Sequence, residues 1–207
     1  MLFRSIKARA LTEAIKPNLI WLAETEDASF YEAFDIVYAW KWMHGSEHFF
    51  RQHQSVQDLM HVLNEQQYPY PEGALQLYFT SNHDENSWNG TEFEKYGAFA
   101  EALSVFSFFY PSSVPLIYSG QELPNRKRLA FFEKDALSWQ QEPERATFYR
   151  TMSALRRQYP LHATFQFLDA GEKILAFRLH QEDQIWYVFL NLGDDDMMID
   201  HEDALAT

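Results

Sequence analysis

The stretch Leu77-Tyr-Phe-Thr-Ser-Asn-His-Asp-Glu-Asn-Ser-Trp88 changes abruptly in character. Its first residues favour a β-strand, and the residues from Asn82 onward are polar groups that donate and accept hydrogen bonds. A buried strand that delivers an imidazole and a carboxylate at its C-terminal end is typical of the active face of an α/β barrel. We therefore expect His83 and Asp84 to lie at such an edge.

The segments around this stretch alternate between helical and strand patterns. Apolar residues at helical spacing predict helices over residues 3–16, 55–67, 91–110 and 143–159. Short apolar runs predict strands at residues 19–23, 34–38, 75–80 and 114–118, the first apolar enough to be covered on both faces. Ser55 and Thr91 each begin a capping sequence. Alternating helices and strands favour a parallel sheet, so residues 1–159 are predicted to form a partial TIM (β/α)8 barrel.

The period of the apolar pattern changes near residue 160. Residues 162–168, 173–179 and 184–190 alternate like strands, and turn residues separate them as hairpins. We expect a small antiparallel β-sheet domain over residues 160–207, truncated at an acidic tail. The predicted fold class is α/β, with two domains.

The composition argues against several classes of function. The chain has 207 residues, no cysteine and a net charge of −13 at pH 7. This acidity argues against nucleic acid and anionic membranes as partners, because both attract clustered Lys and Arg. No apolar run approaches the ~20 residues that span a bilayer. The aromatic content is high, at 17%, and some Trp and Tyr side chains are candidates to stack on sugar rings.

Four segments carry a more specific signal. Ile20-Trp-Leu-Ala-Glu24 and Phe79-Thr-Ser-Asn-His-Asp84 end the first and third predicted strands. Residues 114–122 begin with a proline-containing strand and close on Gly-Gln-Glu, and residues 131–139 follow and end in Trp. In chain order these segments resemble the strand-five, strand-seven, strand-eight and following-loop motifs of the α-amylase family, glycoside hydrolase family 13. The resemblance covers essentially the whole chain and implies barrel strands five to eight, followed by the family's all-β domain.

The resemblance implies retaining hydrolysis of α-1,4-glucans, which needs a nucleophile and an acid/base carboxyl group. Glu24 corresponds to the acid/base, and Asp84 to a further catalytic carboxylate that binds and distorts one sugar ring. His83, Asn82 and Trp88 are the expected substrate-binding residues. In the family, the nucleophile follows strand four, which has no counterpart here. We therefore expect the chain to be inactive alone.

No cofactor and no metal are expected. The family's usual calcium site draws on segments that precede strand five and have no counterpart in this sequence. His44 and His48 are four residues apart, but no third ligand stands nearby, so a surface role is favoured. Asp35 and Glu122 are expected to order strand ends and loops.

Two other functions stay open from the sequence. A non-catalytic carbohydrate-binding relative would keep the barrel without the chemistry, although it would be free to lose Glu24 and Asp84. A transglycosylase or branching enzyme of the same family would carry the same motifs. Whatever the reaction, a half-barrel exposes strand edges and apolar faces that its other half normally covers. We therefore expect self-association through this open edge, or poor stability.

Overall fold

The first part of the chain forms a four-stranded parallel sheet in the order β1-β2-β3-β4. The structure is a computed structural model that describes residues 2–52, 54–67, 70–139, 143–159 and 163–199. The strands are Leu22–Ala23 (β1), Ile36–Tyr38 (β2), Leu75–Tyr78 (β3) and Ser113–Pro115 (β4). They pair in parallel, so their carboxyl ends meet at one edge of the sheet.

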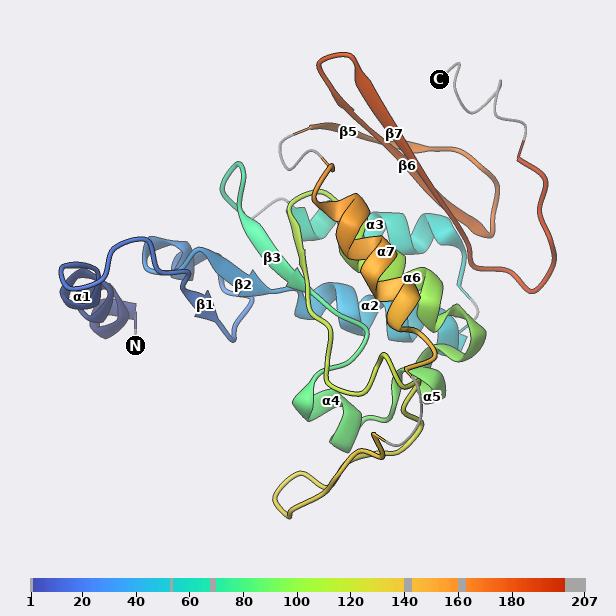
Figure 1. The fold of residues 1–207 in the computed structure, drawn as a ribbon. Helices are drawn as coiled ribbons and strands as arrows, with labels where there is room; N and C mark the ends of the chain where they lie inside the picture. The colour runs from blue at the N-terminus through green and yellow to red at the C-terminus, as the bar shows by residue number, and fades with distance from the viewer. Residues whose placement is uncertain (1, 53, 68–69, 140–142, 160–162, 200–207) are drawn as a thin grey trace.

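Helices precede and connect these strands. They are α1 (Leu2–Glu13), α2 (Trp40–Gln52), α3 (Val56–Gln67), α4 (His83–Trp88), α5 (Glu92–Tyr96), α6 (Ala100–Phe109) and α7 (Ala146–Arg156), with 3-10 turns η1 (Ala28–Glu32) and η2 (Gly97–Phe99). Figure 1 shows α2, α3, α6 and α7 gathered on one side of the parallel sheet, whereas α1 lies apart at its β1 end. Among the described helices, none has the length and hydropathy to cross a membrane.

A second, antiparallel sheet follows α7, as the sequence predicts. Its strands are Thr164–Leu168 (β5), Ile174–Gln181 (β6) and Gln184–Asn191 (β7), in the order β5-β6-β7. The predicted start of its first strand, at residue 162, and the end of the acidic tail lie outside the described residues. Figure 1 shows the group formed by α2, α3, α6 and α7 between the two sheets.

The main apolar core joins both sheets through the helices. Trp42 on α2 stacks on Phe106 of α6 with ring centroids 3.8 Å apart. Phe106 in turn contacts Tyr78 of β3 and Phe177 of β6, at centroid distances of 5.9 and 6.1 Å. All four side chains are almost fully buried. This aromatic core holds the parallel sheet, and thereby its carboxyl edge, in place.

Two helical segments differ from the prediction. The sequence pattern predicts no regular element over residues 40–50, where α2 forms, because its buried face mixes Trp42 and Phe49 with Ser46 and Glu47. The single helix predicted over residues 91–110 is interrupted. Gly97 adopts a positive φ of 56° between α5 and α6, a conformation that glycine accommodates at little steric cost.

Two further predictions, on the burial of the first strand and on the place of Pro143, need correction. The strand predicted at residues 19–23 is not covered on both faces, because the described chain places nothing over Ile20, which is 78% exposed. Pro143 does not lie in the first turn of the last helix. It precedes Arg145, the N-cap of α7, and its carbonyl accepts a hydrogen bond from the Ala146 amide at 3.0 Å.

The predicted capping box at the start of α5 forms. The Glu94 amide donates to Thr91 Oγ1 at 3.2 Å, and the Thr91 amide donates to Glu94 Oε2 at 2.7 Å. Replacing Thr91 with alanine removes this cap and is expected to lower the free energy of unfolding by about 1 kcal/mol. Urea denaturation followed by circular dichroism measures the loss. Thr91→Ser keeps the hydroxyl, so an equal loss in that control would assign the effect to the missing methyl group.

Candidate functional site

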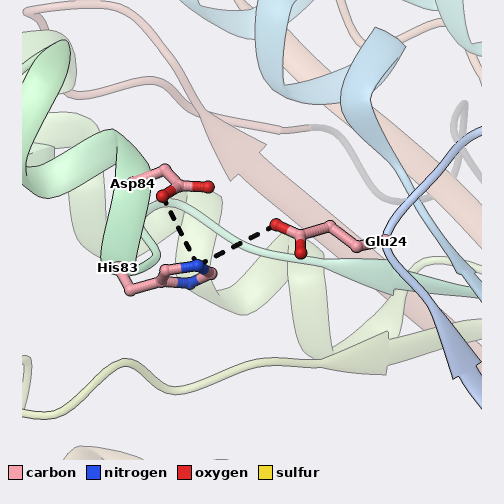
Figure 2. Close-up of side chains that lie close together, drawn as sticks. All are labelled: Glu24, His83 and Asp84. Atoms are coloured by element: carbon pink, nitrogen blue, oxygen red, sulfur yellow. Dashed lines mark ion pairs between the residues drawn. The ribbon is translucent and has the colours of Figure 1, made fainter.

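The predicted site residues lie together at the carboxyl edge of the parallel sheet. Glu24 directly follows β1, and His83 and Asp84 open helix α4. Figure 2 shows the imidazole of His83 facing both carboxylates, with a dashed line drawn to each. His83 Nε2 lies 3.9 Å from Glu24 Oε1 and 3.4 Å from Asp84 Oδ1. Groups that are distant in sequence therefore converge, as expected for the ends of strands in one parallel sheet.

All three side chains are accessible to a ligand. The exposed fractions are 52% for Glu24, 55% for His83 and 33% for Asp84. Their arrangement offers two carboxylates that accept hydrogen bonds and an imidazole that donates or accepts one. Such a set suits a ligand rich in hydroxyl groups.

Asn82 lies directly before His83 and caps the helix that carries it. Its side chain is buried, with 1% of the residue exposed, and its Oδ1 accepts hydrogen bonds from the amides of Asp84 and Glu85 at 3.0 and 2.8 Å. Asn82 is therefore the N-cap of α4, a role that asparagine fills well. This cap fixes where His83 and Asp84 begin the helix, and the substrate contact expected of Asn82 stays a prediction.

Two tyrosines near the carboxylates were missed by sequence reasoning. Burial raises the pKa of Tyr38, and the negative charges of Glu24 and Asp84 raise it further. Burial also raises the pKa of Tyr118, with a second contribution from Asp84. Both phenols therefore stay protonated as hydrogen-bond donors near the site. Their position in the sequence could have identified them, since each is the last residue of a predicted strand.

Solved structures with the same architecture identify the fold. The chain matches a noncanonic maltogenic α-amylase, AmyB, from Thermotoga neapolitana with a TM-score of 0.80 and 24% identity, over 92% of this chain and 46% of that one. The fold is that of the α-amylase structures. An α-amylase from Lactobacillus plantarum matches with a TM-score of 0.80 and 20% identity, over 92% of this chain and 49% of that one.

Another match within this α-amylase fold has a different activity. A cyclic α-maltosyl-(1→6)-maltose hydrolase from Arthrobacter globiformis matches with a TM-score of 0.77 and 16% identity, over 94% of this chain and 46% of that one. The chain spans about half the length of the structures it matches. No protein-family model and no curated protein matches it. The resemblance stated from the sequence is thus confirmed at the level of the fold.

A network of buried charges lies beneath the site in this amylase fold. The Glu92 side chain, 3% exposed, accepts hydrogen bonds from Thr80, Gln121 and Arg145, each at 2.6 Å. Lys95 Nζ lies 3.3 Å from Glu85 Oε2, and these two side chains are 1% and 6% exposed. Burial lowers the pKa of Lys95, although the charge of Glu85 opposes that shift. The network joins α5 to α4, the helix that carries His83 and Asp84.

Two other carboxylates have the ordering roles that we expected. Asp35 Oδ2 accepts a hydrogen bond from the Trp21 amide at 2.8 Å, and its Oδ1 pairs with Arg9 at 2.8 Å. Glu122 accepts a hydrogen bond from the Gly120 amide at 3.1 Å. Each contact ties down a segment at a strand end of the parallel sheet.

One atom from each of Glu24, His83 and Asp84 lies within 4.8 Å of the other two. Imidazole and carboxylate are donors to several divalent metals, so this set has metal-ligand chemistry. Each group is also open to solvent and suits sugar hydroxyls equally. The absence of a metal therefore stays a prediction.

Proposed function

We propose that this chain is part of an α-amylase-type retaining glycoside hydrolase that acts on α-1,4-glucans. The observation that carries the proposal is the convergence of Glu24, His83 and Asp84 at the carboxyl edge of a parallel sheet with the amylase fold. In this proposal β1 to β4 are strands five to eight of the barrel. The barrel part covers residues 1–159, and the all-β domain begins at residue 160.

The proposed roles follow from the chemistry of retaining hydrolysis. Glu24 protonates the leaving oxygen and later accepts a proton from water. Asp84 accepts hydrogen bonds from hydroxyls of the sugar beside the scissile bond, and His83 donates one. Retaining enzymes place the acid/base about 5–5.5 Å from a nucleophilic carboxylate. By the family resemblance Asp84 is the further carboxylate that binds the sugar, and the nucleophile belongs to a strand with no counterpart in this sequence.

Glucan binding by the chain itself provides the first test. Asp84→Ala is expected to weaken binding of maltotriose about tenfold, because the lost hydrogen bonds involve a charged group. Glu24→Gln should change the affinity little, since the acid/base acts in the chemical step. Isothermal titration calorimetry measures both. The control is Asp183→Ala, which removes an exposed carboxylate on the β6–β7 turn and should leave the affinity unchanged. Equal affinities for the wild type and Asp84→Ala would contradict the proposal.

Activity measurements separate this proposal from its rivals. With no nucleophile available, the chain alone should release no sugar from a linear maltooligosaccharide, and detectable hydrolysis would contradict the assignment of roles. A carbohydrate-binding relative would stay inactive even when the remaining barrel strands are supplied. A transglycosylase or branching enzyme would then produce longer or branched products instead of shorter ones.

We also propose that the chain associates with itself through the open edge of the parallel sheet. In the described sheet β1 and β4 each pair with one strand only. Apolar side chains near β1 are exposed: Phe3 by 79%, Ile15 by 88%, Ile20 by 78% and Leu22 by 43%. Unpaired strand edges flanked by apolar surface favour association.

A further inference from the structure

An exposed cluster of three aromatic rings lies at the far end of α4. Trp88 ends this helix, and Phe131 and Phe132 come from the loop between β4 and α7. The ring centroid of Phe131 lies 5.1 Å from that of Trp88 and 4.7 Å from that of Phe132. The exposed fractions are 59% for Trp88, 37% for Phe131 and 81% for Phe132. We call these three residues the aromatic platform.

The loop that carries the two phenylalanines is held in place by hydrogen bonds. Asn86 Oδ1, on α4, accepts from the Leu129 amide at 2.8 Å. Asp135 accepts from the amides of Ala130 and Ala136 at 3.0 and 2.8 Å and forms an ion pair with Lys127. Figure 1 shows this loop, drawn in yellow, extending past α4. The exposure of the rings is therefore built into the fold, at a cost in apolar surface left in water.

The surroundings of the platform favour a neutral ligand. The loop's Lys127 pairs with Asp135, and its Arg128 pairs with Glu94 at 3.0 Å, so neither cation is left to attract an anion. The exposed side chains of Glu133 and Lys134 directly follow Phe132. They supply a donor and an acceptor of hydrogen bonds at the rim. Aromatic faces with polar groups at the rim suit a sugar, which has apolar C–H faces and hydroxyl edges.

The platform and the candidate site share one short helix. Helix α4 carries His83 and Asp84 at its start and Trp88 at its end. A rise of about 1.5 Å per residue separates the two ends by roughly 8 Å. A ligand that reaches both places must be a chain of sugars and not a single ring.

We propose that the aromatic platform is a further sugar-binding subsite, which stacks on pyranose rings of an α-glucan chain whose other end occupies the site at His83 and Asp84. The inference rests on the proposed function and adds that longer glucans are preferred. Phe132 and Trp88, the most exposed rings, provide the stacking faces, and Phe131 supports both by ring contacts.

The test compares a short and a long ligand on the full chain. The wild type is expected to bind maltoheptaose at least about tenfold more tightly than glucose, measured by isothermal titration calorimetry. Phe132→Ala and Trp88→Ala should each weaken maltoheptaose binding about fivefold, because each removes an aromatic stacking face. Both variants should leave glucose binding unchanged, because a single ring at His83 and Asp84 does not reach the platform. Both side chains are exposed, and circular dichroism verifies that the variants fold.

A matched control comes from the same loop. Trp139 is 57% exposed and contacts no ring among the described aromatic residues, so Trp139→Ala should leave both affinities unchanged. An equal loss in this control would overturn the inference. Unchanged maltoheptaose affinity in both platform variants, with weakened maltotriose binding in Asp84→Ala, would overturn the inference but leave the proposed function intact. Failure to bind either sugar would overturn both. Loss of self-association in Phe132→Ala at unchanged glucan affinity would make the platform a protein interface and would also overturn the inference.

Discussion

Replacing Glu92 with leucine is expected to lower the free energy of unfolding by about 3–5 kcal/mol. Glu92 forms an ion pair with Arg145 at 2.6 Å, and the two side chains are 3% and 9% exposed. Removing the carboxylate leaves the Arg145 guanidinium buried without its counter-charge. It also leaves the Thr80 hydroxyl without its acceptor and Gln121 Nε2 with Thr80 Oγ1 in place of two acceptors. A loss of this size is a large fraction of the about 5–15 kcal/mol that stabilises a typical domain.

Urea denaturation followed by tryptophan fluorescence measures this effect, and an exposed ion pair serves as the control. Arg128 and Glu94 pair at 3.0 Å with side chains 47% and 46% exposed, so Arg128→Ala should lower the free energy of unfolding far less than Glu92→Leu does. Adding Arg145→Met to Glu92→Leu should recover most of the loss, because no buried charge then remains unpaired. Similar losses for Glu92→Leu and Arg128→Ala would show that the buried pair is solvated like the exposed one.

This buried network marks the limit of what the sequence predicts about the fold. The strands, the hairpins and the Thr91 capping box follow from local patterns, and the structure contains them. Glu92 looks from its sequence like an ordinary acidic residue in the first turn of a helix. Its burial depends on Thr80, Gln121 and Arg145, which lie on other elements of the chain. Local pattern carries no information about such partners.

Helix α2 was missed for a related reason. Its buried face includes Ser46 and Glu47, so the apolar pattern that identifies an amphipathic helix is interrupted. Gly45 also lowers the helical propensity of the segment. A Cβ atom at Gly45 would lie 2.8 Å from Val62 Cγ1 on α3. The glycine is therefore explained by the close approach of two helices, which only the folded chain reveals.

The candidate site was more predictable than its surroundings. Glu24, His83 and Asp84 follow apolar strands, and strands that run parallel bring such residues to one edge. The sequence did not indicate that α4 begins at His83, so the burial of Asn82 as its cap was unexpected. Nor did it relate Tyr38 and Tyr118 to the carboxylates, because that relation depends on the register of β2 and β4 in the sheet.

Self-association is expected to disappear when Ile20 and Leu22 are both replaced with lysine. Ile20, 78% exposed, lies just before β1, and Leu22, 43% exposed, lies in β1, an edge strand in the described sheet. Lysines on an edge strand oppose edge-to-edge pairing, since burying their ammonium groups is unfavourable. In sedimentation velocity the wild type should contain a species of about twice 24.5 kDa, formed by two open edges that meet. The double variant should sediment as a monomer.

Salt provides an independent check on the same interface. Each copy carries a net charge of −13, so repulsion opposes association at low ionic strength, and screening at about 0.15 M or above should strengthen it. Ile185→Lys is the matched control, because Ile185 is 49% exposed on β7, away from the parallel sheet. A wild type that stays monomeric at every salt concentration would contradict self-association. Equal dissociation by Ile185→Lys would move the interface to the antiparallel sheet, and the apolar surface beside β1 would then need another explanation.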